Sequence, residues 1–489
     1  MAALITAGCG SSQASAVAEP PTLVASLAPP VPASTTAADA SAADAEAAAR
    51  QHNARVAAAL AHVPAVAATV AEIRGLPLKH PVPAAEQSQD DFRRFLESEI
   101  AKEMPAEKSA QSVRALVRLG FLKESIDLGK TVEDAMLSQA GAYYDPETKK
   151  FFLVLVPDDE TMLDVMSAHE LTHAIDDEYF DLAAYSEDPK HELSNDAQQA
   201  RRMVGEGDAT LVMVAYEARI AAHEDILDPK NRAVEQAMVA TFAALDSEQL
   251  AHSAAENPSL VSQMGPGIKA SIDAMSAIPP FILDPLFGAY TKGAAAVAAV
   301  RDAGGWAAVG ELYKNPPEST EQLLHPKEKL IGKRDYPVVF DFAPLPTLFA
   351  GLKPLDADVL GELTMAVYFK NWGDKNPAAE VLGWGGDRYE AFDVGGKVVG
   401  VWMTTWDAPS DSARFAKGYA ATLGRRFPGE PASSVGGPAA VGVTHPDGTT
   451  TLVSHAKGSK DVAIVDGVPA SSASAVLAWL GRAHRSQAK

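Results

Sequence analysis

The sequence predicts a mainly helical α+β fold that is divided into several parts. Apolar residues recur at three- or four-residue steps over much of the chain between residues 49 and 314, which indicates amphipathic helices. Two aromatic and β-branched runs, residues 140–144 and 150–156, flank a turn sequence and predict a β-hairpin. A strand-turn-strand-helix order occurs twice after residue 344, which predicts a small α+β module.

The chain has 489 residues, of which 47% are hydrophobic, enough for two or three domains with real cores. In chain order we expect a signal remnant, a tether, a helical N-terminal region, a central domain and a C-terminal module. Their expected boundaries are residues 1–9, 10–48, 49–135, 136–343 and 344–489.

Residues 4–12 resemble the end of a bacterial lipoprotein signal, in which small residues precede a cysteine that becomes lipidated. The resemblance implies acylation of Cys9, and Gly10 after it implies sorting to an outer membrane. Thr6 departs from the pattern because Leu or Val is usual there. The basic residues of a signal are also missing, and a start codon upstream of Met1 would supply them. The alternative is an incidental cysteine in a low-complexity tail.

Residues 11–48 are Ala, Ser, Pro and Thr with almost no large apolar side chains, so they cannot bury enough surface to offset their ordering entropy. We expect a flexible tether. Helical patterning begins near Ala49, and four prolines between residues 77 and 105 divide it. This helical region should pack on the central domain, and a removable propeptide is the weaker interpretation.

The central domain contains His-Glu-Leu-Thr-His at residues 169–173, a motif that combines two metal ligands with a general base. Positions i and i+4 share one helix face, so the imidazoles of His169 and His173 can reach one ion. The carboxylate of Glu170 can then meet a water bound to that ion. Acidic residues at 158–160 predict the start of this helix, because they suit the positive end of its dipole.

A catalytic zinc normally takes three protein ligands and leaves a fourth position for water. The strongest candidate for the third ligand is Glu206, 33 positions after the motif (206 − 173), on a helix that we expect to begin at residues 194–196. Gly205 and Gly207 flank it, each costing about 1 kcal/mol relative to Ala, which makes sense where another helix and an ion come close. Glu192, in an expected loop, is the rival ligand.

These residues resemble the gluzincins, the thermolysin-like group of zinc metallopeptidases. They are more closely similar to uncharacterised bacterial proteins that carry HExxHAxxD followed by an EGDA element. The resemblance is specific at His169, Glu170, His173 and Glu206, and it extends loosely over residues 76–326. It implies a zincin-like domain in which two histidines and Glu206 hold Zn²⁺ and Glu170 acts as the general base.

Three positions separate this chain from better-known zinc peptidases. Asp176 and Tyr179 stand where the metzincin pattern has a glycine and a third histidine, which excludes that pattern. Thr210 stands where thermolysin has an aspartate, four residues after its ligand glutamate. Asp177, one turn beyond His173, is the candidate to accept the other N–H of an imidazole and fix its tautomer. The alternative is a solvated acidic helix end.

Residues 315–326 resemble the PPxSTEQxLHP element of the same bacterial proteins. Ser319 and Thr320 can cap a short helix that presents His325 at its far end. A histidine donor near a zinc would stabilise the oxyanion of a tetrahedral intermediate, so His325 is a candidate catalytic residue. Local packing of a helix-terminal histidine before a proline is an equal alternative.

The C-terminal module carries no catalytic constellation. We expect a helix at residues 360–372, a hairpin built from residues 383–389 and 398–405, and a helix at 410–423. A second hairpin-plus-helix unit is expected within residues 450–480. The tryptophans near this hairpin, Trp384 and Trp406, are more simply core residues than ligand-binding ones.

The net charge of −22 argues against nucleic acids and anionic membrane surfaces as partners. We expect no stretch that is long enough to cross a bilayer as a helix, so membrane attachment would depend on the lipid anchor alone. Together with the resemblance, the sequence predicts a zinc metallopeptidase of the cell envelope that acts on proteins or peptides. The alternative is a non-enzymatic envelope lipoprotein that uses the same scaffold for binding.

Overall fold

The computed structural model describes the chain in ten stretches, and all structural statements concern these residues. They are residues 24–25, 42–137, 141–155, 160–187, 193–223, 225–244, 277–342, 349, 352–437 and 439–487. Cys9, most of the expected tether and the rival ligand Glu192 lie outside them.

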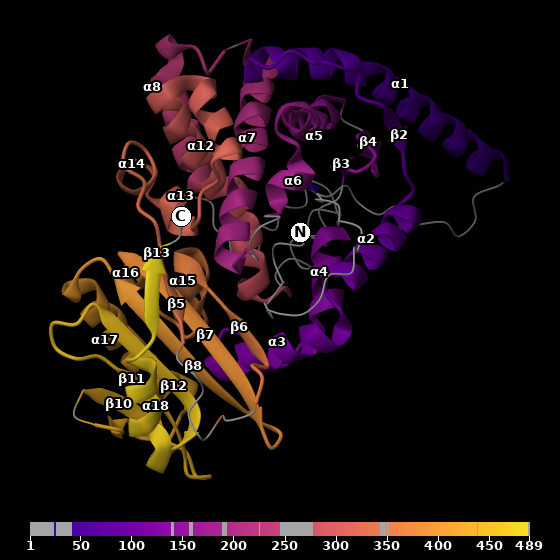
Figure 1. The fold of residues 1–489 in the computed structure, drawn as a ribbon. Helices are drawn as coiled ribbons and strands as arrows, with labels where there is room; N and C mark the ends of the chain where they lie inside the picture. The colour runs from indigo at the N-terminus through magenta and orange to yellow at the C-terminus, as the bar shows by residue number, and fades with distance from the viewer. Residues whose placement is uncertain are drawn as a thin grey trace.

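Helices make up most of the described chain (Figure 1). The first eight are α1 (Ala42–Arg74), α2 (Gln89–Glu103), α3 (Ala106–Leu119), α4 (Leu128–Leu137), α5 (Glu160–Phe180), α6 (Leu182–Ser186), α7 (Asn195–Ala222) and α8 (Arg232–Ala243). The remaining ones are α12 (Pro280–Lys314), α13 (Thr320–Leu324), α14 (Pro326–Lys329), α15 (Gly361–Asn371), α16 (Pro377–Val381), α17 (Pro409–Arg426) and α18 (Ala473–Leu480). Short 3₁₀ turns are η2 (Pro229–Asn231) and η4 (Ala470–Ser472).

The strands form three sheets. A four-stranded sheet has the order β1 (Val24–Ala25), β3 (Ala142–Asp145), β4 (Lys150–Leu153) and β2 (Ala84–Glu86). A seven-stranded sheet has the order β6 (Asp356–Asp358), β7 (Trp384–Val394), β8 (Lys397–Trp406), β12 (Asp461–Pro469), β11 (Thr449–Ser454), β10 (Ala440–Thr444) and β9 (Ser433–Ser434). The third sheet pairs β5 (Val338–Asp341) with β13 (His484–Gln487). The fold is therefore α+β and mainly helical, as predicted.

The predicted hairpin and the two helices after it are confirmed. β3 and β4 pair antiparallel, with Ala142 opposite Leu153. α5 carries the histidine motif, and α7 begins where Ser194 caps it by accepting a hydrogen bond from the amide of Ala197. Figure 1 shows α7 and α12 side by side, with α5 and the hairpin next to them and α1 crossing beyond.

Two glycines let α7 and α12 touch through their backbones. A Cβ added to Gly207 would lie 2.3 Å from the carbonyl carbon of Gly293, and one added to Gly293 would lie 2.3 Å from the carbonyl oxygen of Met203. A second helix therefore does approach at Gly207, as predicted. Gly205 differs, since a Cβ there would meet nothing within 4 Å.

A buried ion cluster ties four helices together. Arg74, at the end of α1, bonds through Nε to Asp208 Oδ2 on α7 at 3.0 Å. Its Nη2 lies 3.2 Å from Asp176 Oδ1 on α5. The hydroxyl of Tyr313 on α12 lies 3.2 Å from both aspartates. The side chain of Arg74 is 1% exposed and those of both aspartates 0%, and the ring of Trp306 lies 4.7 Å from its guanidinium.

The expected N-terminal helical region, residues 49–135, does not pack as one unit. The inner face of α1 lies against α5 and α7 in the core around Val66, Val70 and Leu171. α2, α3 and α4 instead share a core with the C-terminal sheet, in which Phe92 and Trp402 belong to the same buried cluster. Because these helices complete two cores, their packing does not favour a removable propeptide.

Two further expectations about α1 need correction. The helix begins at Ala42, so residues 42–48 of the expected tether are helical, which fits their high alanine content. The expectation that no stretch could cross a bilayer is wrong. Within the described chain, Glu46–Arg74 is long and apolar enough by length and composition. Core helices and signal sequences pass the same test, and this helix packs against α5 and α7.

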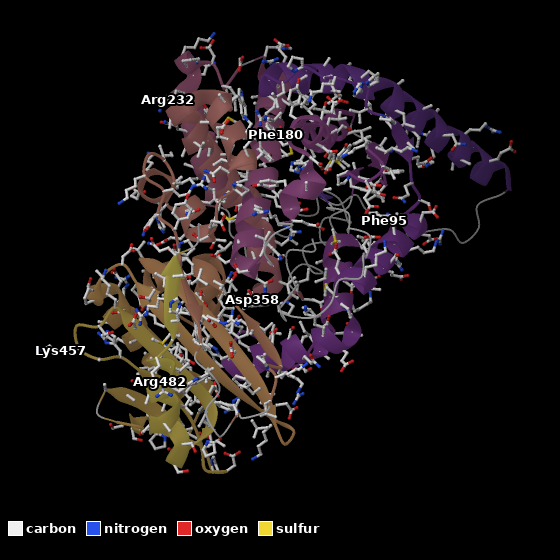
Figure 2. The ribbon with its side chains drawn as sticks, in the orientation of Figure 1. Phe95, Phe180, Arg232, Asp358, Lys457 and Arg482 are labelled. Atoms are coloured by element: carbon white, nitrogen blue, oxygen red, sulfur yellow. The ribbon has the colours of Figure 1, made fainter. Side chains whose placement is uncertain are left out.

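The C-terminal module has the two predicted hairpin-plus-helix units, joined into one sheet by antiparallel pairing of β8 with β12. The carboxylate of Asp387, which is fully buried, accepts hydrogen bonds from the indoles of Trp384 and Trp402. It also accepts the amides of Leu360 and Gly361 at the start of α15. Trp384 and Trp406 are core residues, as predicted. Figure 2 labels Asp358 where this module meets the helices, and its carboxylate accepts the amide of Asn195.

The glycine contact predicts a contrast between two neighbouring substitutions. Gly207→Ala should lower the free energy of unfolding by about 1–3 kcal/mol, because its methyl group overlaps the backbone of α12. Gly205→Ala is the matched control and should leave stability unchanged or raise it by up to about 1 kcal/mol. Urea unfolding monitored by circular dichroism measures both. Equal effects of the two variants would contradict the close approach.

Candidate metal centre

α5 and α7 bring three ligand atoms together. Nε2 of His169 and Nε2 of His173 lie 3.2 Å apart, as the i, i+4 spacing requires. Oε2 of Glu206 lies 3.2 Å from the first of these nitrogens and 3.8 Å from the second. The three atoms lie within 4.8 Å of one another, and all three residues are buried. This group, which sequence analysis predicted, could hold a metal ion.

Burial and mutual contact set the ionisation of this group. Burial lowers the pKa of His169, although the hydrogen bond that Glu206 accepts from its imidazole works against that effect. Burial also raises the pKa of Glu206, but its hydrogen bonds to the two histidines outweigh burial and bring it to about 2. Glu206 is therefore a carboxylate at neutral pH, and neutral imidazoles with a carboxylate are the donors that a divalent cation takes.

The predicted general base is held by the hairpin. Glu170 is fully buried and directly follows a ligand histidine in α5. Its Oε2 accepts a hydrogen bond of 3.0 Å from the amide of Tyr144 in β3. The hairpin thus fixes the carboxylate beside the ligand group.

Sequence reasoning missed Tyr290, which belongs to the same site. Its ring stacks on that of His169, with centroids 5.6 Å apart and planes tilted by 26°. Burial raises the pKa of Tyr290 well above its ordinary value, and the charges of Glu206 and Glu170, together with a hydrogen bond to Glu206, add to that effect. The hydroxyl therefore stays protonated close to both carboxylates. Tyr290 lies 84 positions after Glu206 (290 − 206) in a long apolar helix, so no spacing motif signals it.

The expected role of Asp177 needs correction. Its Oδ2 accepts the hydroxyl of Tyr144 at 2.7 Å and the ammonium of Lys149 at 2.8 Å. Its Oδ1 accepts the amide of Leu182. Asp177 thus ties the hairpin and α6 to the end of α5, because its carboxylate points at the hairpin and not at an imidazole. Nδ1 of His169 is buried and has no hydrogen-bond partner in the structure.

Comparison with known proteins covers the C-terminal module alone. Residues 350–477 match a family model described as a domain of unknown function, DUF8575. The match spans β6 to most of α18 and does not include the metal-ligand group. Neither the search of curated proteins nor that of solved structures gave a match.

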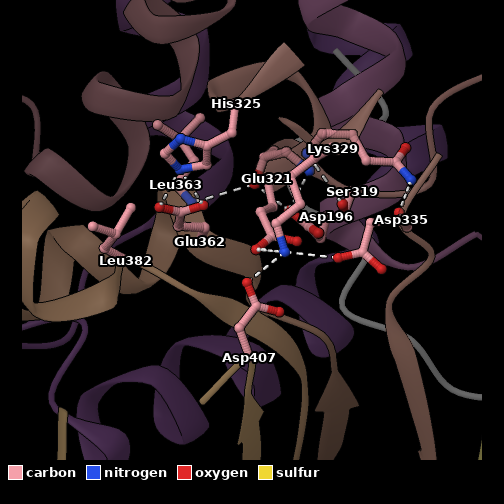
Figure 3. A network of polar contacts seen from close by, with 12 residues as sticks. Asp196, Ser319, Glu321, His325, Lys329, Asp335, Glu362, Leu363, Leu382 and Asp407 are labelled. Carbon is pink, nitrogen blue, oxygen red and sulfur yellow. Dashed lines mark hydrogen bonds and ion pairs between the residues drawn. The ribbon is translucent and has the colours of Figure 1, made fainter. Parts of the chain in front are cut away.

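His325 lies at the junction with the DUF8575 region and not in the metal-ligand group. Its Nε2 lies 2.9 and 3.1 Å from the two carboxylate oxygens of Glu362 on α15 (Figure 3). Thr320, at the start of the same short helix, bonds to Asp196. Asp196 precedes Glu206 by ten residues, or about 15 Å of helix. The predicted cap at Ser319 is confirmed. The short helix, however, directs His325 to Glu362 and not to the metal-ligand group.

Lys329 binds three carboxylates at this junction. Its Nζ lies 3.1 Å from Glu321, 2.7 Å from Asp335 and 2.6 Å from Asp407, as Figure 3 shows. Burial raises the pKa of Glu321 to about 9, although the Lys329 ammonium works against that effect. Asp407 follows β8 of the DUF8575 region, so the lysine joins that region to α13. The PPxSTEQxLHP element therefore belongs to a domain junction.

The His325–Glu362 pair predicts a pH-dependent contribution to stability. The hydrogen bond to Glu362 raises the pKa of His325 above its ordinary 6.5. Burial raises the pKa of the partner Glu362 as well. The pair therefore stabilises the fold below pH 6.5 while Glu362 stays ionised, and this contribution is lost as the pH rises through the raised pKa of His325. His325→Gln should lower Tm by a few degrees at pH 6, with a smaller loss at pH 9.

Thermal unfolding at both pH values measures this difference. His62→Gln, which removes the exposed pair with Asp164, is the control and should change Tm little at either pH. A Tm loss for His325→Gln that is the same or larger at pH 9 would rule out the charged pair.

Proposed function

We propose that this protein is a zinc-dependent metallopeptidase that hydrolyses peptide bonds at the bacterial cell envelope. The observation that carries the proposal is the convergence of His169, His173 and Glu206 beside the buried carboxylate of Glu170. Cys9 would anchor the chain through a lipid, on the periplasmic face or at the outer membrane. Its substrates would be proteins or peptides, with no role for nucleic acid.

The ligand atoms have the spacing that zinc takes. Zinc binds imidazole nitrogen at about 2.0–2.1 Å and carboxylate oxygen at about 2.0–2.2 Å, so tetrahedral ligands lie about 3.3–3.5 Å apart. The three pairs here are separated by 3.2, 3.2 and 3.8 Å. Two histidines and one glutamate leave a fourth position open, as in catalytic zinc sites. This donor set supports zinc over Ca²⁺ or Mg²⁺, which prefer oxygen ligands.

The bound metal would supply Lewis acidity, which polarises a substrate carbonyl and lowers the pKa of water. Glu170 takes a proton from the water whose oxygen adds to the carbonyl carbon. The carboxylate then gives this proton to the amide nitrogen as the C–N bond breaks. The second proton of the water follows it to the amine, which yields a new carboxylate and an ammonium group. The hydrogen bond from the amide of Tyr144 keeps one oxygen of Glu170 in place, so the other can move the proton.

Tyr290 would donate a hydrogen bond from its hydroxyl to the carbonyl oxygen as negative charge develops there. Its raised pKa keeps the proton available at neutral pH. Such a donor contributes about 10²–10³-fold to the rate when it is aimed at the oxyanion. We assign this role to Tyr290 and no longer to His325, because Tyr290 stacks on a ligand histidine.

The second candidate is a non-enzymatic lipoprotein that uses the metal site for structure or binding. The burial of the ligand group favours it, since Glu206 is only 5% exposed and the histidines are less exposed still. The retained Glu170 favours the enzyme, because a metal held only for structure needs no carboxylate in that place. Metal content and hydrolysis by variants decide between the two.

Glu206→Ala should remove most of the metal, because two histidines alone make a weak site. Purified protein should carry about one zinc per chain by atomic emission, and the variant should carry well under half of that. Glu217→Ala is the matched control, since Glu217 is an exposed glutamate on the same helix. Full retention of zinc by Glu206→Ala would remove Glu206 from the ligand set and return attention to Glu192.

Glu170→Gln should keep the metal and lose hydrolysis. The amide has nearly the same size and can still accept from Tyr144, but it cannot take a proton from water. A peptide library incubated with wild type and variant, read by mass spectrometry, measures the difference at equal zinc content. Cleavage by the variant at the wild-type rate would refute the proposed mechanism.

A further inference from the structure

We propose that Arg202 binds the free C-terminal carboxylate of a peptide, so that the metal site acts on chain ends. This inference rests on the proposed peptidase function and names its substrate class. Arg202 would be a specificity-determining residue that contacts the substrate next to the metal ligands.

Helix geometry places Arg202 beside the metal-ligand group. Arg202 precedes Glu206 by four residues in α7, so both side chains leave the same face of the helix. Its positive charge acts on the carboxylate of Glu206 and on the hydroxyl of Tyr290, two groups of the candidate site. The guanidinium therefore lies on the side of α7 that these two groups share.

Among the described residues, the guanidinium of Arg202 forms no ion pair, unlike that of Arg74. Its Nη1 is buried and has no hydrogen-bond partner in the structure. By contrast, Nη1 of the adjacent Arg201 donates to the carbonyl oxygens of Tyr185 and Glu187, both at 2.8 Å. Arg74 lies between two aspartates. Arg202 as a whole is only partly buried, so solvent and a ligand can reach part of it.

No acid in the described part of the chain pairs directly with Arg202. Glu103 in α2 is the other carboxylate whose charge acts on it, but no ion pair joins the two. Burial raises the pKa of Glu103 to about 7, so this group is only partly ionised at neutral pH. The buried Nη1 is thus left without a partner. A ligand carboxylate would supply one, because arginine and carboxylate form two parallel hydrogen bonds.

The charge balance and the spacing both suit a C-terminal residue. A divalent ion with Glu206 and neutral histidines carries one net positive charge, and Arg202 adds another, in a protein of net charge −22. Arg202 and Glu206 are separated by about 6 Å along the helix axis. One extended residue of about 3.5 Å, with contacts of about 2 Å to the metal and about 2.8 Å to the guanidinium, spans about 8 Å, and both side chains also extend away from the axis.

This spacing fits removal of one C-terminal residue. Water adds to the carbonyl carbon of the last peptide bond, and the C–N bond breaks. The shortened chain keeps the new carboxylate, and the released amino acid takes both protons of the water, one of them through Glu170. Arg202 holds the α-carboxylate of the leaving residue throughout and exchanges no proton.

Binding of a matched peptide pair tests the inference without relying on turnover. The probes are Ala-Phe-Ala as the free acid and as the C-terminal amide, titrated calorimetrically into zinc-loaded Glu170→Gln protein. The free acid should bind about 10- to 100-fold more tightly, because a hydrogen bond to a charged group is worth about 1.5–3 kcal/mol. Arg202→Met in the same background should abolish the difference, and Arg202→Lys should retain part of it.

Arg219→Met is the matched control. It makes the same change on the same helix, at an arginine that pairs with Glu72 and Asp225. It should keep the full preference for the free acid. Equal binding of acid and amide by the Arg202-containing protein would overturn the inference, and this comparison needs no variant at Arg202. A preference that survives in Arg202→Met would also overturn it.

Hydrolysis by wild-type protein separates this inference from the proposed function. In one outcome, the protein cleaves internal bonds and amidated peptides as fast as it cleaves free acids. That result would support the peptidase function and refute the role of Arg202. Arg202-dependent binding of the free acid without cleavage of any library peptide would support the carboxylate site and refute the peptidase.

Discussion

The candidate metal centre depends on the burial of one arginine between two aspartates. Arg74 contacts Asp176, three residues after His173, and Asp208, two residues after Glu206. The same ion cluster therefore fixes the rotation of α5 and of α7 about their axes. Side chains leave a helix in directions that differ by about 100° per residue. Rotation of either helix about its axis would therefore turn its ligand atoms away from the others. Buried ion pairs of this kind contribute little net stability but penalise other arrangements strongly, because any misfit leaves a charge without a partner.

The packing of α7 on α12 adds a second constraint of a different kind. Gly207 and Gly293 allow backbone contact, which leaves no space between these helices for another side-chain layer. This close approach brings Tyr290, three residues before Gly293, onto the ring of His169. Three consecutive residues of the EGDA element make different contacts. Glu206 faces the other ligands, Gly207 contacts α12 and Asp208 pairs with Arg74.

The DUF8575 region is joined to the helices of the candidate metal centre through polar contacts that surround α15. Asp387 accepts the first amides of this helix, and Glu362 on it pairs with His325. Asp196, at the start of α7, accepts the hydroxyl of Thr320. These bonds lie at the opposite end of α7 from Arg219, and they attach the module to the same helix that carries Glu206 and Arg202. The helix that carries Glu206 is therefore connected directly to the C-terminal module.

The sequence alone determined the features that depend on neighbours along the chain. Two histidines at i and i+4 must share a helix face. The turn at residues 146–149 reverses the direction of the chain between two strands. Ser194 can cap only the helix that follows it. Glu206 was predictable because its glycine-flanked position within a capped helix is itself a local pattern. The glycine turn at residues 395–397 likewise predicted the first hairpin of the C-terminal module.

Tertiary structure alone decided which distant residues meet. Tyr290 reaches His169, and Arg74 reaches Asp208, across more than a hundred residues in each case (290 − 169 and 208 − 74). Asp177 was expected at the metal from its spacing, and His325 from its place at the end of a short capped helix, yet each has another partner. Local spacing fixes the face of a helix from which a side chain leaves. What that face meets depends on how helices cross, and that depends on packing, charge burial and glycine contacts summed over the whole fold.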